Sequence, residues 1–297
     1  MNKWLLMQSN LLILVGLLVA FFAHGMGLQA QPTWLFVSLG AIVLLGVPHG
    51  SLDVLFALRA YELNSLKAWV VFLMAYLLVA LGIILLWLLL PVWFFIGFLI
   101  FSALHFSDDL NTPNHMLIKL SYGAAVICLP SIVHGEALVG LYALFVDASV
   151  AQRIVTVSQW LNYPILFLMG ILLFNRQINI REKLDAYAVL AIMTLLPPIL
   201  AFAVYFCLMH SARHLIRSHA FFGKLNARLF IMALVLPTLA VIIMACGVWL
   251  FTTTRTFELD LIRMVFIGLA ALTFPHAWVL KQAKFTEQFR KPSQIRQ

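Results

Sequence analysis

Four histidines lie inside hydrophobic segments of this chain of 297 residues: His49, His105, His210 and His214. An ionisable side chain at membrane depth is costly, so such residues usually mark a functional site. Neutral imidazole is also the commonest metal-binding side chain. His210 and His214 are separated by one helical turn, which places both rings on one helix face. The four histidines therefore indicate a metal centre buried among membrane helices.

The composition is that of a membrane protein. Hydrophobic residues make up 64% of the chain and charged residues only 10%, whereas soluble domains carry about 25% charged residues. We therefore predict an all-α, polytopic transmembrane bundle in which residues 1–297 form a single integral membrane domain. The net charge of +8 does not indicate a nucleic-acid partner, because the basic residues lie in short loops and in the C-terminal tail.

Hydrophobicity predicts about eight to ten spans, since each needs about 20 apolar residues. The pair Pro197-Pro198 must interrupt or turn the chain, so the segments on either side of it form one kinked helix or two. Residues 1–30 hold the first span, for which a cleavable signal peptide is the less favoured alternative. The predicted spans lie near residues 10–27, 33–58, 68–90, 92–109, 117–135, 155–174, 185–197, 198–220, 228–251 and 259–281.

The distribution of basic residues predicts the orientation. With ten spans and the N-terminus inside, 16 of the 19 Lys and Arg residues lie on the cytoplasmic side, including the basic tail at 282–297. This asymmetry follows the positive-inside rule and places both termini in the cytoplasm. On this map the four histidines and His276 all fall at a similar depth, which makes a common site geometrically possible.

Two carboxylates follow two of these histidines at the same spacing. The patterns are His49-x-x-x-Asp53 and His105-x-x-x-Asp109. A metal-bound histidine usually donates its other ring N–H to a carboxylate or a carbonyl, so Asp53 and Asp109 are candidates to orient the ligands. The alternative is that these acids neutralise Arg213 or Arg217 within the bundle.

The residues alone leave the metal and the chemistry open. Nitrogen ligands without thiolates suit iron, copper or zinc, and the three cysteines form no C-x-x-C motif. Candidates for substrate contact near the histidines are Tyr205, Trp278 and His276. His276 could instead bind the metal or hydrogen-bond a ligand.

Three other protein classes compete with this interpretation. A diiron desaturase or hydroxylase acting on an apolar lipid needs around eight clustered histidines, and this chain has nine in total with a single His-x-x-x-His. A haem-b electron carrier would place histidine pairs on facing helices. A transporter could use the histidines and aspartates as a proton relay without a stoichiometric metal.

Several segments resemble the Brp/Blh family of membrane-bound β-carotene 15,15′-dioxygenases. They occur in the order of the family and spread over most of the chain. The combination of PHG-x-x-D with an intramembrane His-x-x-x-Asp and YF-x-x-x-HS-x-RH is specific. The matching segments are GVPHGSLDVL (46–55), SALHFSDD (102–109), ICLPSIVHGE (127–136), LAFAVYFCLMHSARHLIR (200–217) and LTFPHAWVL (272–280).

The resemblance implies cleavage of all-trans-β-carotene at its central double bond by O₂, giving two molecules of all-trans-retinal. It implies a non-haem Fe(II) centre whose ligands carry over onto His49, His105, His210 and His214. Retinal made in this way typically supplies a microbial rhodopsin. The family therefore implies a bacterial or archaeal inner membrane as the location.

Overall fold

A computed structural model describes residues 3–25, 32–112, 115–223, 225–252 and 257–285. Every regular element in these ranges is helical, which confirms the predicted all-α class. Most of the predicted tail at 282–297 lies outside the described residues. The elements are α1 (Lys3–Gly25), α2 (Pro32–Ala41), η2 (Ile42–Gly46), α3 (Pro48–Ser51), α4 (Asp53–Tyr61), α5 (Leu66–Leu89), α6 (Pro91–Phe106), η3 (Ser107–Asp109), α7 (Met116–Cys128), α8 (Pro130–Val133), α9 (Gly135–Tyr142), α10 (Ala148–Phe174), α11 (Ile180–Leu195), α12 (Pro198–Tyr205), η4 (Phe206–Ser211), α13 (Ala212–Phe222), α14 (Ala227–Thr252) and α15 (Phe257–Gln282).

The protein is a multi-pass membrane protein. Within the described ranges, eight helical stretches are long and apolar enough to cross a bilayer, a number at the lower end of the predicted range. Several of them join consecutive helical elements into one span. The stretches are Lys3–Ala23, Thr33–Tyr61, Leu66–Leu89, Pro91–Asp109, Met116–Val133, Ala148–Phe174, Pro198–Phe222 and Ala227–Val248.

Two of the ten predicted spans are not among these eight. The segment 185–197 belongs to α11, a helix of 16 residues that rises about 24 Å, short of a hydrocarbon core of about 30 Å. The segment 259–281 belongs to α15, which has 26 residues but carries Glu258 and Asp260 in its first turn. Proline does separate α11 from α12, since α11 ends at Leu195 and α12 begins at Pro198.

The chain forms two compact units. Unit 1 comprises Met1–Ile42 and Phe95–Ile216, and unit 2 comprises Val43–Phe94 and Arg217–Gln297. The chain therefore passes between the units three times, within η2, α6 and α13. Each unit contains residues from both halves of the sequence.

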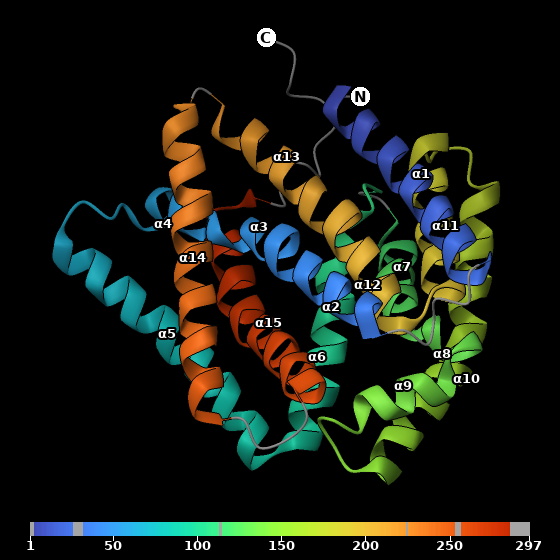
Figure 1. The fold of residues 1–297 in the computed structure, drawn as a ribbon. Helices are drawn as coiled ribbons and strands as arrows, with labels where there is room; N and C mark the ends of the chain where they lie inside the picture. The colour runs from blue at the N-terminus through green and yellow to red at the C-terminus, as the bar shows by residue number, and fades with distance from the viewer. Residues whose placement is uncertain (1–2, 26–31, 113–114, 224, 253–256, 286–297) are drawn as a thin grey trace. The chain divides into compact units, whose positions relative to one another are not determined.

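In unit 1, α10 packs along α7 and contacts α8 and α9, while α12 packs against α2 and α11 (Figure 1). Gly123 of α7 lies directly against the backbone of α6. A Cβ atom at this position would clash with the carbonyl oxygen of Ala103 and would lie 2.9 Å from the backbone nitrogen of Ser107. Only glycine permits this approach, which sets the position of η3 immediately after α6.

A buried ion pair ties four parts of unit 1 together. The guanidinium of Arg213, only 3% exposed, donates to the carboxylate of Asp185 and to the backbone carbonyl of Asp109 (2.9 Å). Its Nε donates to Gln8 of α1 (3.2 Å). Ser9 of α1 donates to the same Asp185 carboxylate (2.9 Å). Because the charge is paired and hydrogen-bonded, it can be buried here.

In unit 2, α15 packs against α4 and α5, and α14 packs against α3 (Figure 1). Ser51 of α3 and Thr238 of α14 share a hydrogen bond of 2.7 Å. An aromatic cluster packs around Phe56 of α4, whose ring lies 4.9 Å from that of Phe285 and 5.5 Å from that of Phe221. These contacts fix the short helices α3 and α4, which carry His49 and Asp53.

Candidate metal centre

In unit 1, a buried carboxylate joins a histidine to a tyrosine. The Nδ1 of His210 lies 3.1 Å from both carboxylate oxygens of Asp109. The hydroxyl of Tyr205 donates to Oδ2 of the same carboxylate at 2.7 Å. All three residues are buried. Asp109, which follows His105 by four residues, thus orients a histidine from a distant part of the sequence.

A π-helical turn makes this arrangement possible. His210 lies in η4, where the helix widens. In an α-helix Tyr205 and His210 would face different directions, because a separation of five residues exceeds one turn. A π-helical turn holds more residues than an α-helical one, because its backbone hydrogen bonds join residues five apart, and it therefore rotates both side chains towards one side. They meet there at Asp109, and the ring of Phe206 stacks on His210 with 5.5 Å between centroids.

Two further histidines of unit 1 belong to the same region. The rings of His105 and His210 meet edge to face, with centroids 4.8 Å apart. Phe101 stacks on His105 with its ring plane tilted by 10°. His214 is buried and follows His210 by one helical turn. Unit 1 therefore holds three of the four predicted ligands and one predicted carboxylate.

Unit 2 repeats the arrangement with different residues. The Nδ1 of His276 lies 2.7 Å from Oδ1 of Asp53, and the hydroxyl of Tyr76 donates to Oδ2 of Asp53 at 2.8 Å. The rings of His49 and His276 meet edge to face, with centroids 5.2 Å apart. We call the two groups Tyr205–Asp109–His210 and Tyr76–Asp53–His276 the His–Asp–Tyr triads.

The backbone before His49 supplies the partner of its ring. The Nδ1 of His49 lies 2.5 Å from the carbonyl oxygen of Gly46, the last residue of the π-helical element η2. In a regular helix this carbonyl would accept the N–H of Gly50, but that N–H donates to Val47 instead (3.1 Å). The irregular turn around Pro48 thus leaves the Gly46 carbonyl to the ring.

These hydrogen bonds determine the tautomer of three rings. The partners of His49, His210 and His276 are a carbonyl or a carboxylate, which only accept hydrogen bonds, so each Nδ1 carries the proton. Each neutral ring then presents a lone pair at Nε2, the form in which imidazole binds a metal. The donor set fits a nitrogen-ligated metal ion. Of the sulfur donors close by in sequence, Cys207 donates its thiol to the carbonyl of Ala41, and Met209 accepts from the side-chain amide of Gln8 at 3.7 Å.

The predicted carboxylates do orient histidines, but not the histidines that precede them in sequence. Of the alternative cationic partners, Arg213 donates to the backbone carbonyl of Asp109, while its charge pairs with the carboxylate of Asp185. Tyr76 was not predicted from the sequence. It lies 23 residues from Asp53 on another helix, and no spacing rule connects the two.

The three candidate substrate contacts lie in different environments. Tyr205 is fully buried and its hydroxyl is bound to Asp109. His276 is buried against Asp53. Trp278 is exposed on α15. Of the remaining histidines, His134 lies 3.4 Å from the carbonyl of Leu195, and His219 packs edge to face on Phe230.

A buried histidine set of this kind in a helical membrane protein is the arrangement expected of a membrane metal site. Comparison with known proteins gives the family. The family described as beta-carotene 15,15′-dioxygenase matches residues 40–283. A beta-carotene 15,15′-dioxygenase of an uncultured marine bacterium, 66A03, is 30% identical over 264 residues, which cover 80% of this chain and 90% of that protein. The chain belongs to the β-carotene 15,15′-dioxygenase family. No solved structure matches it.

Proposed function

We propose that this protein cleaves all-trans-β-carotene at its central 15,15′ double bond with O₂, yielding two molecules of all-trans-retinal. The observation that carries the proposal is the set of buried histidines whose Nδ1 protons are held by carboxylates or a carbonyl. Family membership indicates that the substrate is β-carotene. Each carbon of the broken double bond receives one oxygen atom, so one carotene and one O₂ account for both aldehydes.

The proposed metal is non-haem Fe(II), held by His49, His105, His210 and His214. Iron bound there would activate O₂ for attack on the polyene. Nitrogen donors without a thiolate are compatible with iron as well as with copper or zinc, and iron is the metal that the family resemblance implies. Asp109 holds the His210 ring in position, and Tyr205 in turn holds the Asp109 carboxylate. The Gly46 carbonyl has the same effect on His49.

The protein around the site positions the substrate and excludes water. β-Carotene is confined to the apolar part of the bilayer, so it would enter between helices rather than from water. A symmetrical hydrocarbon has no polar group near its centre, so the site of cleavage must be set by the shape of an apolar channel. Phe206 and Phe202 stack successively on His210, with 5.1 Å between the two phenyl centroids. These rings keep water from one side of the histidine.

We further propose a cellular setting for this activity. Retinal is the chromophore of microbial rhodopsins, so a retinal-binding rhodopsin is the expected consumer of the product. The enzyme would lie in the inner membrane of a bacterium or archaeon, with both termini in the cytoplasm. The excess of Lys and Arg on that side of the predicted spans supports the orientation.

Expression in a bacterium that makes β-carotene tests the proposal. The wild-type protein should consume the pigment and produce all-trans-retinal, as measured by chromatography. His210→Ala should leave the pigment intact, whereas His219→Ala, a matched change at an exposed position of α13, should behave as wild type. Retinal formation by His210→Ala, or none from folded and iron-loaded wild type, would contradict the proposal.

A further inference from the structure

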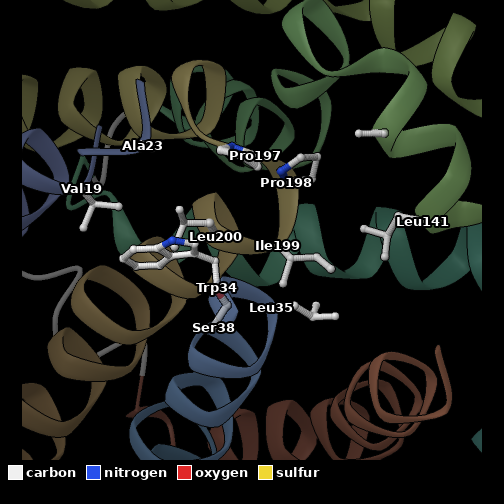
Figure 2. Close-up of a pocket in the computed structure, with 11 residues that line it drawn as sticks. Val19, Ala23, Trp34, Leu35, Ser38, Leu141, Pro197, Pro198, Ile199 and Leu200 are labelled. Atoms are coloured by element: carbon white, nitrogen blue, oxygen red, sulfur yellow. The ribbon is translucent and has the colours of Figure 1, made fainter. Parts of the chain in front are cut away.

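An apolar cavity of about 200 Å³ lies in unit 1 and is lined by none of the histidines discussed above. Its walls come from α1, α2, α9 and the start of α12 (Figure 2). Figure 2 shows the indole of Trp34 beside Leu200, with Ile199 and Leu35 further along the same cavity. Nearly all of its lining is hydrocarbon, so it suits a hydrophobic ligand.

One polar side chain interrupts this apolar lining. Ser38 of α2 is 2% exposed, and its hydroxyl oxygen has no hydrogen-bond partner among the residues that the structure describes. Buried hydroxyl groups are normally paired, because an unpaired one costs free energy. Beside the indole N–H of Trp34, the cavity thus offers the Ser38 hydroxyl as a hydrogen-bonding group to a ligand that is otherwise apolar.

The cavity and the histidines are connected by one continuous helix. Leu200 lines the cavity, and the same helix continues through α12 into η4, where His210 lies ten residues later. At about 1.5 Å per residue this is about 15 Å. That length is comparable with the distance from the central double bond of an extended carotenoid to its end ring.

The size of the cavity selects the part of the ligand that it can hold. Sites that enclose a whole drug-sized molecule measure about 300–1,000 Å³, so a cavity of about 200 Å³ cannot hold a complete carotenoid. It is sufficient for one substituted cyclohexene ring. The rest of the polyene would extend along α12 towards His210.

We infer that this cavity binds one end ring of the carotenoid substrate and that Ser38 favours a ring bearing a hydroxyl group. The inference rests on the proposed carotene cleavage. A seated ring stops the polyene at a fixed distance from His210, and this selects the central double bond. The Ser38 hydroxyl pairs with an oxygen substituent on the ring, which would otherwise be buried without a partner.

Filling the cavity tests the inference through the length of the products. Ala23 lines the cavity and is buried, whereas Leu17 lies on the exposed face of the same helix. Ala23→Phe should lower kcat/KM for β-carotene about tenfold or more and give aldehydes longer and shorter than retinal, because the ring can no longer seat fully. Leu17→Phe should cleave centrally at the wild-type rate. Ile199→Phe serves as a second filling variant if Ala23→Phe does not fold.

The role of Ser38 is tested by a ratio of two substrates. For each enzyme, kcat/KM is measured with β-carotene and with its 3,3′-dihydroxy derivative. Ser38→Ala should lower the ratio of dihydroxy to unsubstituted substrate about tenfold, as expected for one lost hydrogen bond. An unchanged ratio would overturn the assignment of Ser38.

Failure of this inference differs from failure of the proposed function. If wild type forms no retinal, the proposed function is wrong. If wild type forms retinal and both filling variants, folded and iron-loaded, form retinal alone at the wild-type rate, the cavity does not hold the ring. That result would also be expected if the acyl chain of a bilayer lipid occupied the cavity. Off-centre products, or loss of central cleavage with iron retained, support the inference.

Discussion

Two aspartates perform the same task in two parts of the chain. Asp109 and Asp53 each accept one hydrogen bond from a tyrosine hydroxyl and one from the Nδ1 of a histidine. Each carboxylate is buried and would be costly if it were not bound in this way. The tyrosine hydroxyl positions the carboxylate, and the carboxylate positions the imidazole with a proton on Nδ1. The Nε2 atom is then the one that can bind a metal. Such outer partners of metal-binding histidines usually tune the affinity for the metal.

Replacing either carboxylate by its amide should therefore weaken iron binding. Asp109→Asn and Asp53→Asn keep the shape of the side chain but remove the charge that makes the imidazole more basic. We expect iron affinity to fall about tenfold to a hundredfold in each variant, measured by titration of metal-free protein with Fe(II). Asp147→Asn, at an exposed position before α10, is the matched control. Wild-type affinity in both triad variants would show that the carboxylates do not act on the metal.

The sequence singled out Asp53 and Asp109 as candidates but did not identify the histidines that they contact. The spacing in His105-x-x-x-Asp109 places both residues on one helix face, and this argument is limited to a single helix. His210 and Tyr205 reach Asp109 from a helix about a hundred residues away. Tyr76 could not be identified at all, because its partner is set by packing between helices. A tyrosine in an apolar span is more often a packing residue.

Two features of the helices position the side chains of the triads, and neither can be predicted from the hydrophobicity of the sequence. One is the π-helical geometry of η2 and η4, which depends on where backbone hydrogen bonds shift by one residue. The other is the buried charge of Arg213 and Asp185, which ties α11 to the region of Asp109. Eight of the ten predicted spans are confirmed. Their apolar stretches are long enough to be recognised from hydrophobicity alone. Helix α11 departs from the prediction because its 16 residues are too few to cross a hydrocarbon core of about 30 Å.

The close approach of α6 and α7 should make Gly123 sensitive to the smallest substitution. Gly123→Ala would force a methyl group into the backbone of Ala103 and shift η3, which carries Asp109. We expect a loss of about 1–3 kcal/mol, as is usual for overpacking, and a lower iron content, measured by thermal unfolding and metal analysis. Gly97→Ala, in α6 with open space around it, should be neutral or slightly stabilising. Equal melting temperatures for the two variants would refute the close contact.

A double-mutant cycle tests the buried ion pair. Arg213→Met leaves the buried Asp185 without its partner and should cost about 3–5 kcal/mol. Arg213→Met combined with Asp185→Leu removes both charges, and should be less destabilising than Arg213→Met alone. Arg176→Lys, at an exposed position, serves as the control. If the double variant is as unstable as the sum of the two single ones, the two charges are not coupled.

Across the whole chain, each compact unit contains histidines of the proposed ligand set. His105, His210 and His214 belong to unit 1, and His49 belongs to unit 2 together with His276. From hydrophobicity and charge, the sequence predicts that all of them lie at one depth in the bilayer, and this stays a prediction. The sequence alone did not predict the two His–Asp–Tyr triads, because they depend on contacts between distant segments. The function was predictable because the diagnostic motifs surround the histidines, and family membership agrees with them.

The central claim is that a metal held by these histidines cleaves the carotene. The most direct measurement is retinal formation by purified protein that has been stripped of metal and then supplied with Fe(II), Zn(II) or Cu(II) in separate samples. We predict that activity disappears with the metal and returns with Fe(II) alone, at about one iron per chain, while His210→Ala stays inactive. Full activity in the metal-free protein, or equal activity of His210→Ala after iron addition, would contradict the account.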